Sequence, residues 1–119
     1  MVRGAGAAEP QRVTIFGDSQ LAAVDQTAAA RAMLAKGIAL DLRTAVCRRL
    51  VQDSCPYEGG RPTTVLDEVR DTSSPLGSVV VILVGYNEFE AQFADNIERL
   101  MRALLARDVT RVLWLTLTE

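Results

Sequence analysis

The tripeptide Gly17-Asp18-Ser19 could present a serine hydroxyl as a nucleophile. It follows a β-branched and aromatic run, residues 12–16, and precedes an Ala-rich segment that begins at Gln20. If the run is a strand and the segment a helix, the hydroxyl lies at the mouth of a sheet. The Ser19 N–H then lies in the first helical turn, where unpaired donors favour the negative charge that attack on a carbonyl creates. The alternative is structural, because Asp and Ser are ordinary helix N-caps.

Two further groups of residues could serve the same chemistry. Gly85-Tyr86-Asn87 follows the apolar run 78–84, and the Asn87 amide could donate a hydrogen bond toward the space above Ser19. Donors aimed at a developing oxyanion are worth about 3 kcal/mol each. Gly59-Gly60 lies in an irregular segment, where a glycine can present its N–H to a ligand without steric interference. Taken singly, Asn87 could instead cap a helix, and the glycine pair could be only a turn.

Taken together, the three groups resemble the sequence blocks of the GDSL/SGNH hydrolase family. Residues 16–19 (Phe-Gly-Asp-Ser) match its first block, with Gln20 where the family usually has Leu. The glycine block is matched by Gly59-Gly60, with a slight preference for Gly60. Residues 85–88 (Gly-Tyr-Asn-Glu) match the Gly-x-Asn-Asp block, with Glu in place of the final Asp. The resemblance extends from about residue 12 to the end of the sequence.

The resemblance implies a serine esterase without a cofactor that forms an acyl-enzyme on Ser19. The backbone N–H groups of Ser19 and Gly60 and the side-chain amide of Asn87 would form the oxyanion hole. The substrate would be a small-molecule, carbohydrate or lipid ester, such as an O-acetyl sugar or an acyl lipid.

The catalytic base of the family is absent from this sequence. In the family, a His preceded three residues earlier by Asp lies near the C-terminus, whereas this sequence contains no His. A serine hydroxyl without a base is a poor nucleophile at neutral pH. We therefore expect little or no esterase activity from this chain alone, and an Asp-x-x-His block beyond residue 119 of a longer coding sequence. Asp67, Glu68 or Glu88 could act as a base in principle, but nothing in the sequence places one of them against Ser19.

Two other interpretations stay open. A non-catalytic module of the same fold would bind a ligand in its pocket, or would pair with a partner through its open sheet edge. An unrelated flavodoxin-like binding domain is a third interpretation, although the sequence lacks the glycine-rich phosphate loops of nucleotide-binding domains.

The order of elements predicts an α/β domain with an open parallel sheet. Strands are predicted at 12–16, 38–46, 78–84 and 111–119, and helices at 20–36, from Pro62 onward, and at 90–107. The second strand alternates apolar and charged residues, as is typical of an edge, and the third is apolar throughout, as is typical of a central strand. This pattern predicts the flavodoxin-like order 2-1-3-4 with helices on both faces. Residues 12–119 would form this domain, incomplete at its C-terminus, and residues 1–11 a flexible tail.

The fourth strand contains four consecutive apolar residues, 112–115. Such a run predicts cover on both faces and a neighbouring strand beyond it. Because an uncovered apolar edge promotes association, we expect either further chain or another subunit there, and self-association through this strand.

Composition narrows the classes of partner. Of the 119 residues, 49% are hydrophobic and 24% charged, with a net charge of −2, as is typical of a soluble globular protein. The adjacent Arg48 and Arg49 are interpreted as a solvated edge, so no nucleic-acid partner is expected. No signal-peptide core or membrane-spanning run is visible, which favours a cytoplasmic location for the chain as written without excluding export of its parent protein. Cys47 and Cys55 cannot form the usual zinc site without His, so no metal is expected, and both a disulfide and two free thiols fit the sequence.

Overall fold

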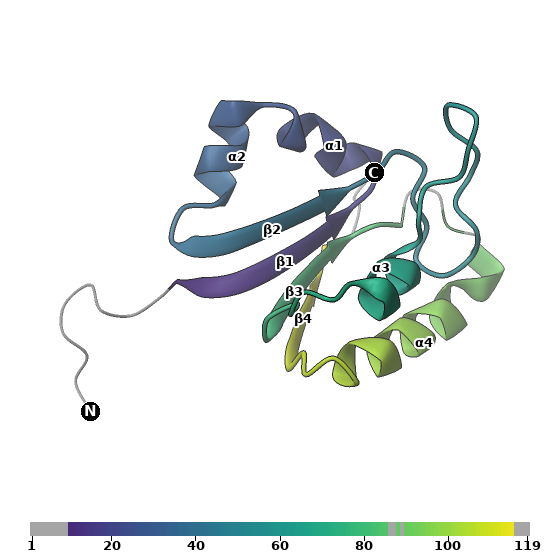
Figure 1. Ribbon diagram of the computed structural model, residues 1–119. Helices are drawn as coiled ribbons and strands as arrows, with labels where there is room; N and C mark the ends of the chain where they lie inside the picture. Colours follow the sequence, from purple (N-terminus) through teal and green to yellow (C-terminus); the bar gives the residue numbers. More distant parts are fainter. Residues whose placement is uncertain (1–9, 86–87, 89, 116–119) are drawn as a thin grey trace.

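The computed structural model describes residues 10–85, 88 and 90–115 (Figure 1). Its four strands are β1 (Gln11–Gly17), β2 (Ile38–Thr44), β3 (Val79–Leu83) and β4 (Arg111–Trp114). They pair in parallel in the order β2-β1-β3-β4. This confirms the predicted open sheet, its strand order and the edge position of the second strand.

Helices cover both faces of the sheet, as the alternation of elements predicts. The α1 (Ser19–Asp25) and α2 (Ala28–Leu34) helices lie on one face, and α3 (Val65–Asp71) and α4 (Phe93–Leu105) lie on the other (Figure 1). A short 3₁₀ turn, η1 (Glu90–Gln92), leads into α4. Alternate side chains of β1 therefore enter different hydrophobic clusters: Phe16 belongs to the α3/α4 side, whereas Val13 and Ile15 belong to the α1/α2 side.

The two clusters differ in size. The α3/α4 side holds most of the buried apolar residues, including Val69, Ile82, Leu100 and Leu104, each fully buried. On the α1/α2 side, no residue of either helix is fully buried, and Leu21 and Leu34 pack only partly against the strands. Packing against α3 and α4 is therefore the main source of hydrophobic stabilisation.

The helix predicted at 20–36 is interrupted. Thr27 has an extended backbone (φ −111°, ψ 110°), and its hydroxyl donates to the Ala23 carbonyl at 3.0 Å, so the chain ends α1 and starts α2 at Ala28. Asp25 holds the bend, because its carboxylate pairs with Arg31 on α2 and accepts a hydrogen bond at 2.9 Å from the Thr44 hydroxyl on β2. The alanine-rich composition favoured a single helix, but a β-branched threonine and this long-range anchor overrode it.

The α3 helix begins three residues later than predicted, and Pro62 is not its first residue. Thr64 is the N-cap of a capping box: its hydroxyl accepts from the Asp67 N–H at 3.0 Å, and the Asp67 carboxylate accepts from the Thr64 N–H at 3.1 Å. This reciprocal pair satisfies the Thr64 and Asp67 N–H groups at the start of the helix, which favours a start at Val65. Val65, Leu66 and Val69 of this helix are buried.

One face of β4 is uncovered in the described part of the chain. Val112 and Trp114 pack against the α3/α4 cluster, whereas Leu113 and Leu115 on the other face are 52% and 49% exposed. Within residues 111–115 this face is uncovered because α1 and α2 lie over β1 and β2 (Figure 1), and cover by further chain or another subunit stays a prediction. Self-association through this strand stays a prediction. Across the described residues, no helix has both the length and the apolar character needed to cross a membrane.

Candidate functional site

The turn between β1 and α1 is built by a glycine and a buried aspartate. A Cβ atom at Gly17 would lie 2.6 Å from the Leu21 Cβ, so only glycine lets α1 start this close to the end of the strand. Asp18 is 1% exposed and caps α1, with its Oδ1 accepting from the Gln20 N–H at 3.0 Å. Its carbonyl accepts from the Leu21 and Ala22 N–H groups, both at 3.1 Å. The predicted N-cap role therefore belongs to Asp18 and not to Ser19.

Ser19 is the first residue of α1 and its side chain is exposed. Within the part of the chain that the structure describes, its hydroxyl and its backbone N–H have no hydrogen-bond partner. An exposed hydroxyl beside an uncommitted N–H can approach a carbonyl carbon while the N–H faces the carbonyl oxygen. Because Asp18 provides the cap, the Ser19 hydroxyl is not needed for capping.

The structure brings the first and third sequence blocks together at the carboxyl end of the sheet. The Asp18 N–H donates to the Leu83 carbonyl of β3 at 3.3 Å, and the Gly85 N–H donates to Asp18 Oδ2 at a long 3.4 Å. The loop after β2 lies at the same end of the sheet, because the Ala45 N–H donates to the Gly17 carbonyl at 3.1 Å. The predicted convergence of these segments is thus present in the backbone. Tyr86 and Asn87, the predicted oxyanion donor, lie outside the described residues.

The predicted donor Gly60 is already engaged. Tyr57 and Gly60 close a two-residue hairpin in which the Gly60 N–H donates to the Tyr57 carbonyl at 3.1 Å and the reverse bond measures 2.7 Å. Glu58 (φ 50°) and Gly59 (φ 83°) form the turn, both with the positive φ of a type I′ hairpin. Gly60 can serve an oxyanion hole only if this bond opens. The N–H of Gly59 has no acceptor among the described residues, so of the two glycines only Gly59 has an N–H that the hairpin does not use.

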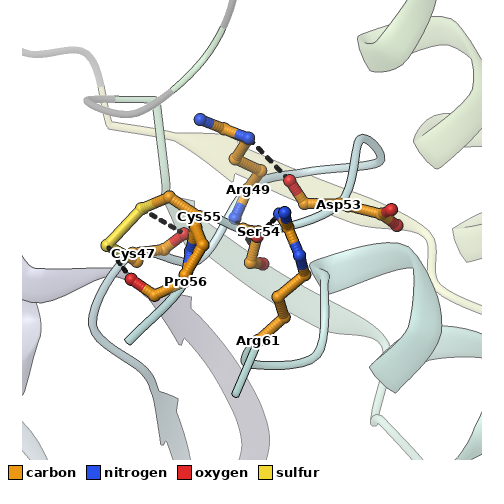
Figure 2. Close-up of a disulfide and its surroundings, with 7 residues drawn as sticks. All are labelled: Cys47, Arg49, Asp53, Ser54, Cys55, Pro56 and Arg61. Carbon is orange, nitrogen blue, oxygen red and sulfur yellow. Dashed lines mark hydrogen bonds between the residues drawn. A yellow bond between two sulfur atoms is a disulfide. The ribbon is translucent and has the colours of Figure 1, made fainter. Parts of the chain in front are cut away.

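A disulfide braces the base of this hairpin loop. Cys47 and Cys55 are bonded, with their Cα atoms 5.2 Å apart, which answers a question that the sequence left open. Figure 2 shows the surrounding contacts: Arg61 donates to the Ser54 carbonyl at 2.7 Å, and Arg49 donates to the Asp53 carbonyl at 2.6 Å. The loop 45–64 projects from the end of the sheet toward which the β1 and β2 arrows point (Figure 1). The disulfide and these hydrogen bonds constrain the loop, which begins beside the β1–α1 turn.

Arg48 is not part of a solvated edge, contrary to the interpretation of the Arg48-Arg49 pair. It is 4% exposed, and its guanidinium donates to the Thr63 carbonyl, the Thr63 hydroxyl and the Arg43 carbonyl at 3.0 to 3.2 Å. Burial lowers the pKa of this guanidinium from its ordinary value, an effect that the carboxylates of Glu68 and Asp67 partly offset. Arg48 thus holds the two ends of the loop together, a role that the sequence pattern did not reveal.

Glu88, which stands where the family has Asp, links the third block to the loop after β2. Its Oε2 accepts from the Leu50 N–H at 2.9 Å. Its Oε1 is buried and, like the neighbouring Asn96 Nδ2, lacks a hydrogen-bond partner among the described residues. Burial raises the pKa of Glu88 above its ordinary 4.5, and the negative charge of Asp18 adds to the rise. The Leu50 hydrogen bond and the Arg49 charge act in the opposite direction, as does the nearby Asn96 side chain, although its Nδ2 does not meet hydrogen-bond geometry; burial outweighs all three.

Ionisation of the buried Glu88 is expected to lower the stability of the wild type as pH rises, and Glu88→Gln should remove this effect. Because the folded-state pKa of Glu88 is raised, the folded protein binds the proton more tightly than the unfolded chain. The free energy of unfolding therefore falls as pH rises from about 4.5 through the raised pKa. Gln keeps an acceptor for the Leu50 N–H but cannot ionise. In urea unfolding at a series of pH values between about 4 and 7, the unfolding free energy of the variant should rise relative to that of the wild type as pH increases.

Glu98→Gln provides the matched control, because Glu98 is an exposed carboxylate on α4. It should keep the wild-type dependence of unfolding free energy on pH. Parallel profiles for Glu88→Gln and the wild type would show that burial of Glu88 has no thermodynamic consequence.

Comparison with known proteins adds no relative. The chain matches no protein-family model, no curated protein sequence and no solved structure. Within the described ranges, no three Asp, Glu or Cys side chains converge in a way that could hold a metal ion. The candidate site therefore consists of the exposed Ser19, the buried Asp18 that positions it, and the braced loop beside them, and its resemblance to the GDSL/SGNH hydrolases rests on sequence motifs alone.

Proposed function

We propose that this chain carries the nucleophile of an SGNH-type ester hydrolase, with Ser19 attacking the ester carbonyl. The observation that carries the proposal is that Ser19 is exposed and that its hydroxyl and N–H have no hydrogen-bond partner among the described residues. The buried cap residue Asp18 positions Ser19 at the carboxyl end of the sheet. Its carboxylate also accepts a hydrogen bond from Gly85, the first residue of the third sequence block. An exposed serine or a buried aspartate cap occurs at many helix starts. Here both occur within the sequence motif, and this combination supports Ser19 as a nucleophile.

The reaction forms a bond between Ser19 Oγ and the acyl carbon and breaks the bond from that carbon to the alcohol oxygen. The hydroxyl proton passes to a base and then to the departing alcohol, and water later releases the acid. The Ser19 N–H, the Gly59 or Gly60 N–H and the Asn87 amide are the proposed donors to the oxyanion. Because the 119 residues contain no His, the imidazole must come from outside them. The proposed substrates are O-acetyl sugars or acyl lipids.

A fluorophosphonate probe with added imidazole tests this proposal. Ser19 Oγ would bond to phosphorus, fluoride would leave, and imidazole would take the proton, so the adduct is stable and is counted by intact-mass spectrometry. A positioned base contributes roughly 10²–10⁴-fold, and free imidazole should restore part of this, about a tenfold rise in the rate of Ser19 labelling. Peptide mapping locates the adduct.

Ser19→Ala should abolish the adduct in the presence and in the absence of imidazole. Ser73→Ala, which removes an exposed hydroxyl from a loop outside the site, should label at the wild-type rate. Labelling that persists in Ser19→Ala, or that is spread over several serines, would show that Ser19 is not the nucleophile.

A non-catalytic module of the same fold is the second candidate. The hairpin bond that occupies the Gly60 N–H favours it, because this predicted oxyanion donor is used for structure. This candidate predicts no Ser19 adduct at any concentration of imidazole, in a protein whose thermal unfolding remains cooperative. The labelling experiment therefore separates the two candidates.

A further inference from the structure

Four arginine side chains line one cavity between α3 and α4. The cavity has a volume of about 520 Å³, and no acidic residue is among the described residues that line it: Val69, Arg70, Arg99, Arg102, Ala103, Ala106 and Arg107. It lies on the opposite face of the sheet from α1, whose first residue is Ser19. The four arginines lie between Arg70 and Arg107, a stretch of 38 positions, so they do not form a basic run in the sequence.

Helical spacing accounts for the shape of the cavity. Arg99, Arg102, Ala103 and Ala106 recur at intervals of three and four residues, which places them on one face of the helical chain. The two alanines have short side chains, so they leave space beneath the guanidinium groups. Val69 of α3, which is fully buried, also borders the cavity. The lining thus combines three apolar residues with four arginines.

The guanidinium groups retain unused donors. Arg107 donates to the Val69 carbonyl and, at 3.1 Å, to the Ser74 carbonyl, which fixes its position at the cavity. Arg102 pairs with Glu98 at 2.5 Å, and both side chains are largely exposed. Arg70 and Arg99 have no carboxylate partner within the described residues. Each guanidinium carries five N–H donors, so most donors around the cavity are available to a ligand.

Helix electrostatics explain only part of this cluster. Arg70 and Arg102 lie in the last turns of α3 and α4, where a cation interacts favourably with the helix dipole. Arg99 lies near the middle of α4, where that effect has decayed, and it adds a like charge to the cluster. The whole chain has a net charge of −2, so general basicity does not account for the cluster either.

We propose that this cavity binds a small molecule bearing two or more phosphate charges. The planar guanidinium fork matches phosphate oxygens and forms charge-assisted hydrogen bonds with them. A cavity of about 520 Å³ has the size of an ordinary small-molecule site, and its apolar lining residues can contact the uncharged part of such a ligand. The site is separate from Ser19 and does not depend on the function proposed for that residue.

Titration of the full chain with inorganic pyrophosphate, followed by isothermal calorimetry, tests the site. The wild type should bind, and Arg70→Gln and Arg99→Gln should each weaken binding about tenfold, as expected for loss of a hydrogen bond between charged groups. Both side chains are exposed, so the variants should unfold at the wild-type urea concentration. Sulfate at the same ionic strength should compete weakly, because it carries fewer charges.

Arg111→Gln is the matched control, since Arg111 is an exposed arginine on β4 that does not line the cavity. It changes the net charge equally and should alter pyrophosphate affinity by less than about twofold, because distant exposed charges are screened. Absence of wild-type binding, or equal weakening by all three variants, would overturn the proposal. Binding of a single-stranded oligonucleotide that depends on Arg70 and Arg99, without pyrophosphate binding, would also overturn it in favour of a nucleic-acid surface.

Discussion

Asp18→Ala is expected to lower the free energy of unfolding by about 2 kcal/mol, through loss of a helix cap and of a buried acceptor. The Asp18 carboxylate is the acceptor for two backbone donors, the Gln20 N–H at 3.0 Å and the Gly85 N–H at 3.4 Å. Alanine leaves both donors without this partner in a place that is 1% exposed. Urea unfolding measures the loss, and labelling of Ser19 by the fluorophosphonate should slow, because the turn that positions its hydroxyl loosens.

Asp18→Asn separates the charge of this side chain from its shape. The Asn oxygen can accept from one of the two backbone donors, but its NH₂ group then faces the other, so we expect an intermediate loss of stability, about 1 kcal/mol. Removing the negative charge should also lower the pKa of Glu88, since Asp18 helps to raise it. Carbon-13 NMR of the Glu88 carboxyl reports this pKa directly. Wild-type stability in both variants would show that the cap and the Gly85 contact are energetically irrelevant.

The arrangement of the sheet could be predicted because its signals are local. The alternation of β2 and the uninterrupted apolar run of β3 reflect how many faces of each strand are buried, and burial follows from position in the sheet. Strands that alternate with helices must then pair in parallel through crossovers. What local pattern could not show is where a helix stops for a tertiary reason. The bend at Thr27 depends on Asp25 and on its contact with Thr44 of β2, 19 residues away.

The candidate site was predicted only in part, for a related reason. A motif located Ser19 and its neighbours, and the structure brings the first block to Gly85 as the topology requires. The hairpin bond that occupies the Gly60 N–H depends on turn geometry that two adjacent glycines leave undetermined. The burial of Arg48 depends on carbonyl groups from two separate segments. The arginine cavity likewise results from the packing of α3 against α4, and a linear search for basic runs cannot find it.

A second large effect is expected from Gly77→Ala, in the segment that leads into β3. Gly77 has φ +82°, and a Cβ atom there would lie 2.6 Å from the backbone oxygen of Arg12 on β1. The segment has little freedom to retreat, because the Leu76 carbonyl accepts a hydrogen bond at 2.8 Å from the buried Thr14 hydroxyl. Left-handed strain of about 1 kcal/mol and overpacking of about 2 kcal/mol should together lower the unfolding free energy by about 3 kcal/mol.

Gly37→Ala distinguishes backbone strain from steric overlap. Gly37 has the same φ of +82°, but a Cβ atom there would have no heavy atom within 4 Å. Its substitution should therefore lower the unfolding free energy by only about 1 kcal/mol, the cost of the left-handed conformation. The difference between the two variants in urea unfolding isolates the contact between residue 77 and β1. Equal losses would mean that the Gly77 segment and β1 separate enough to admit a methyl group, and that the close contact with Arg12 costs nothing.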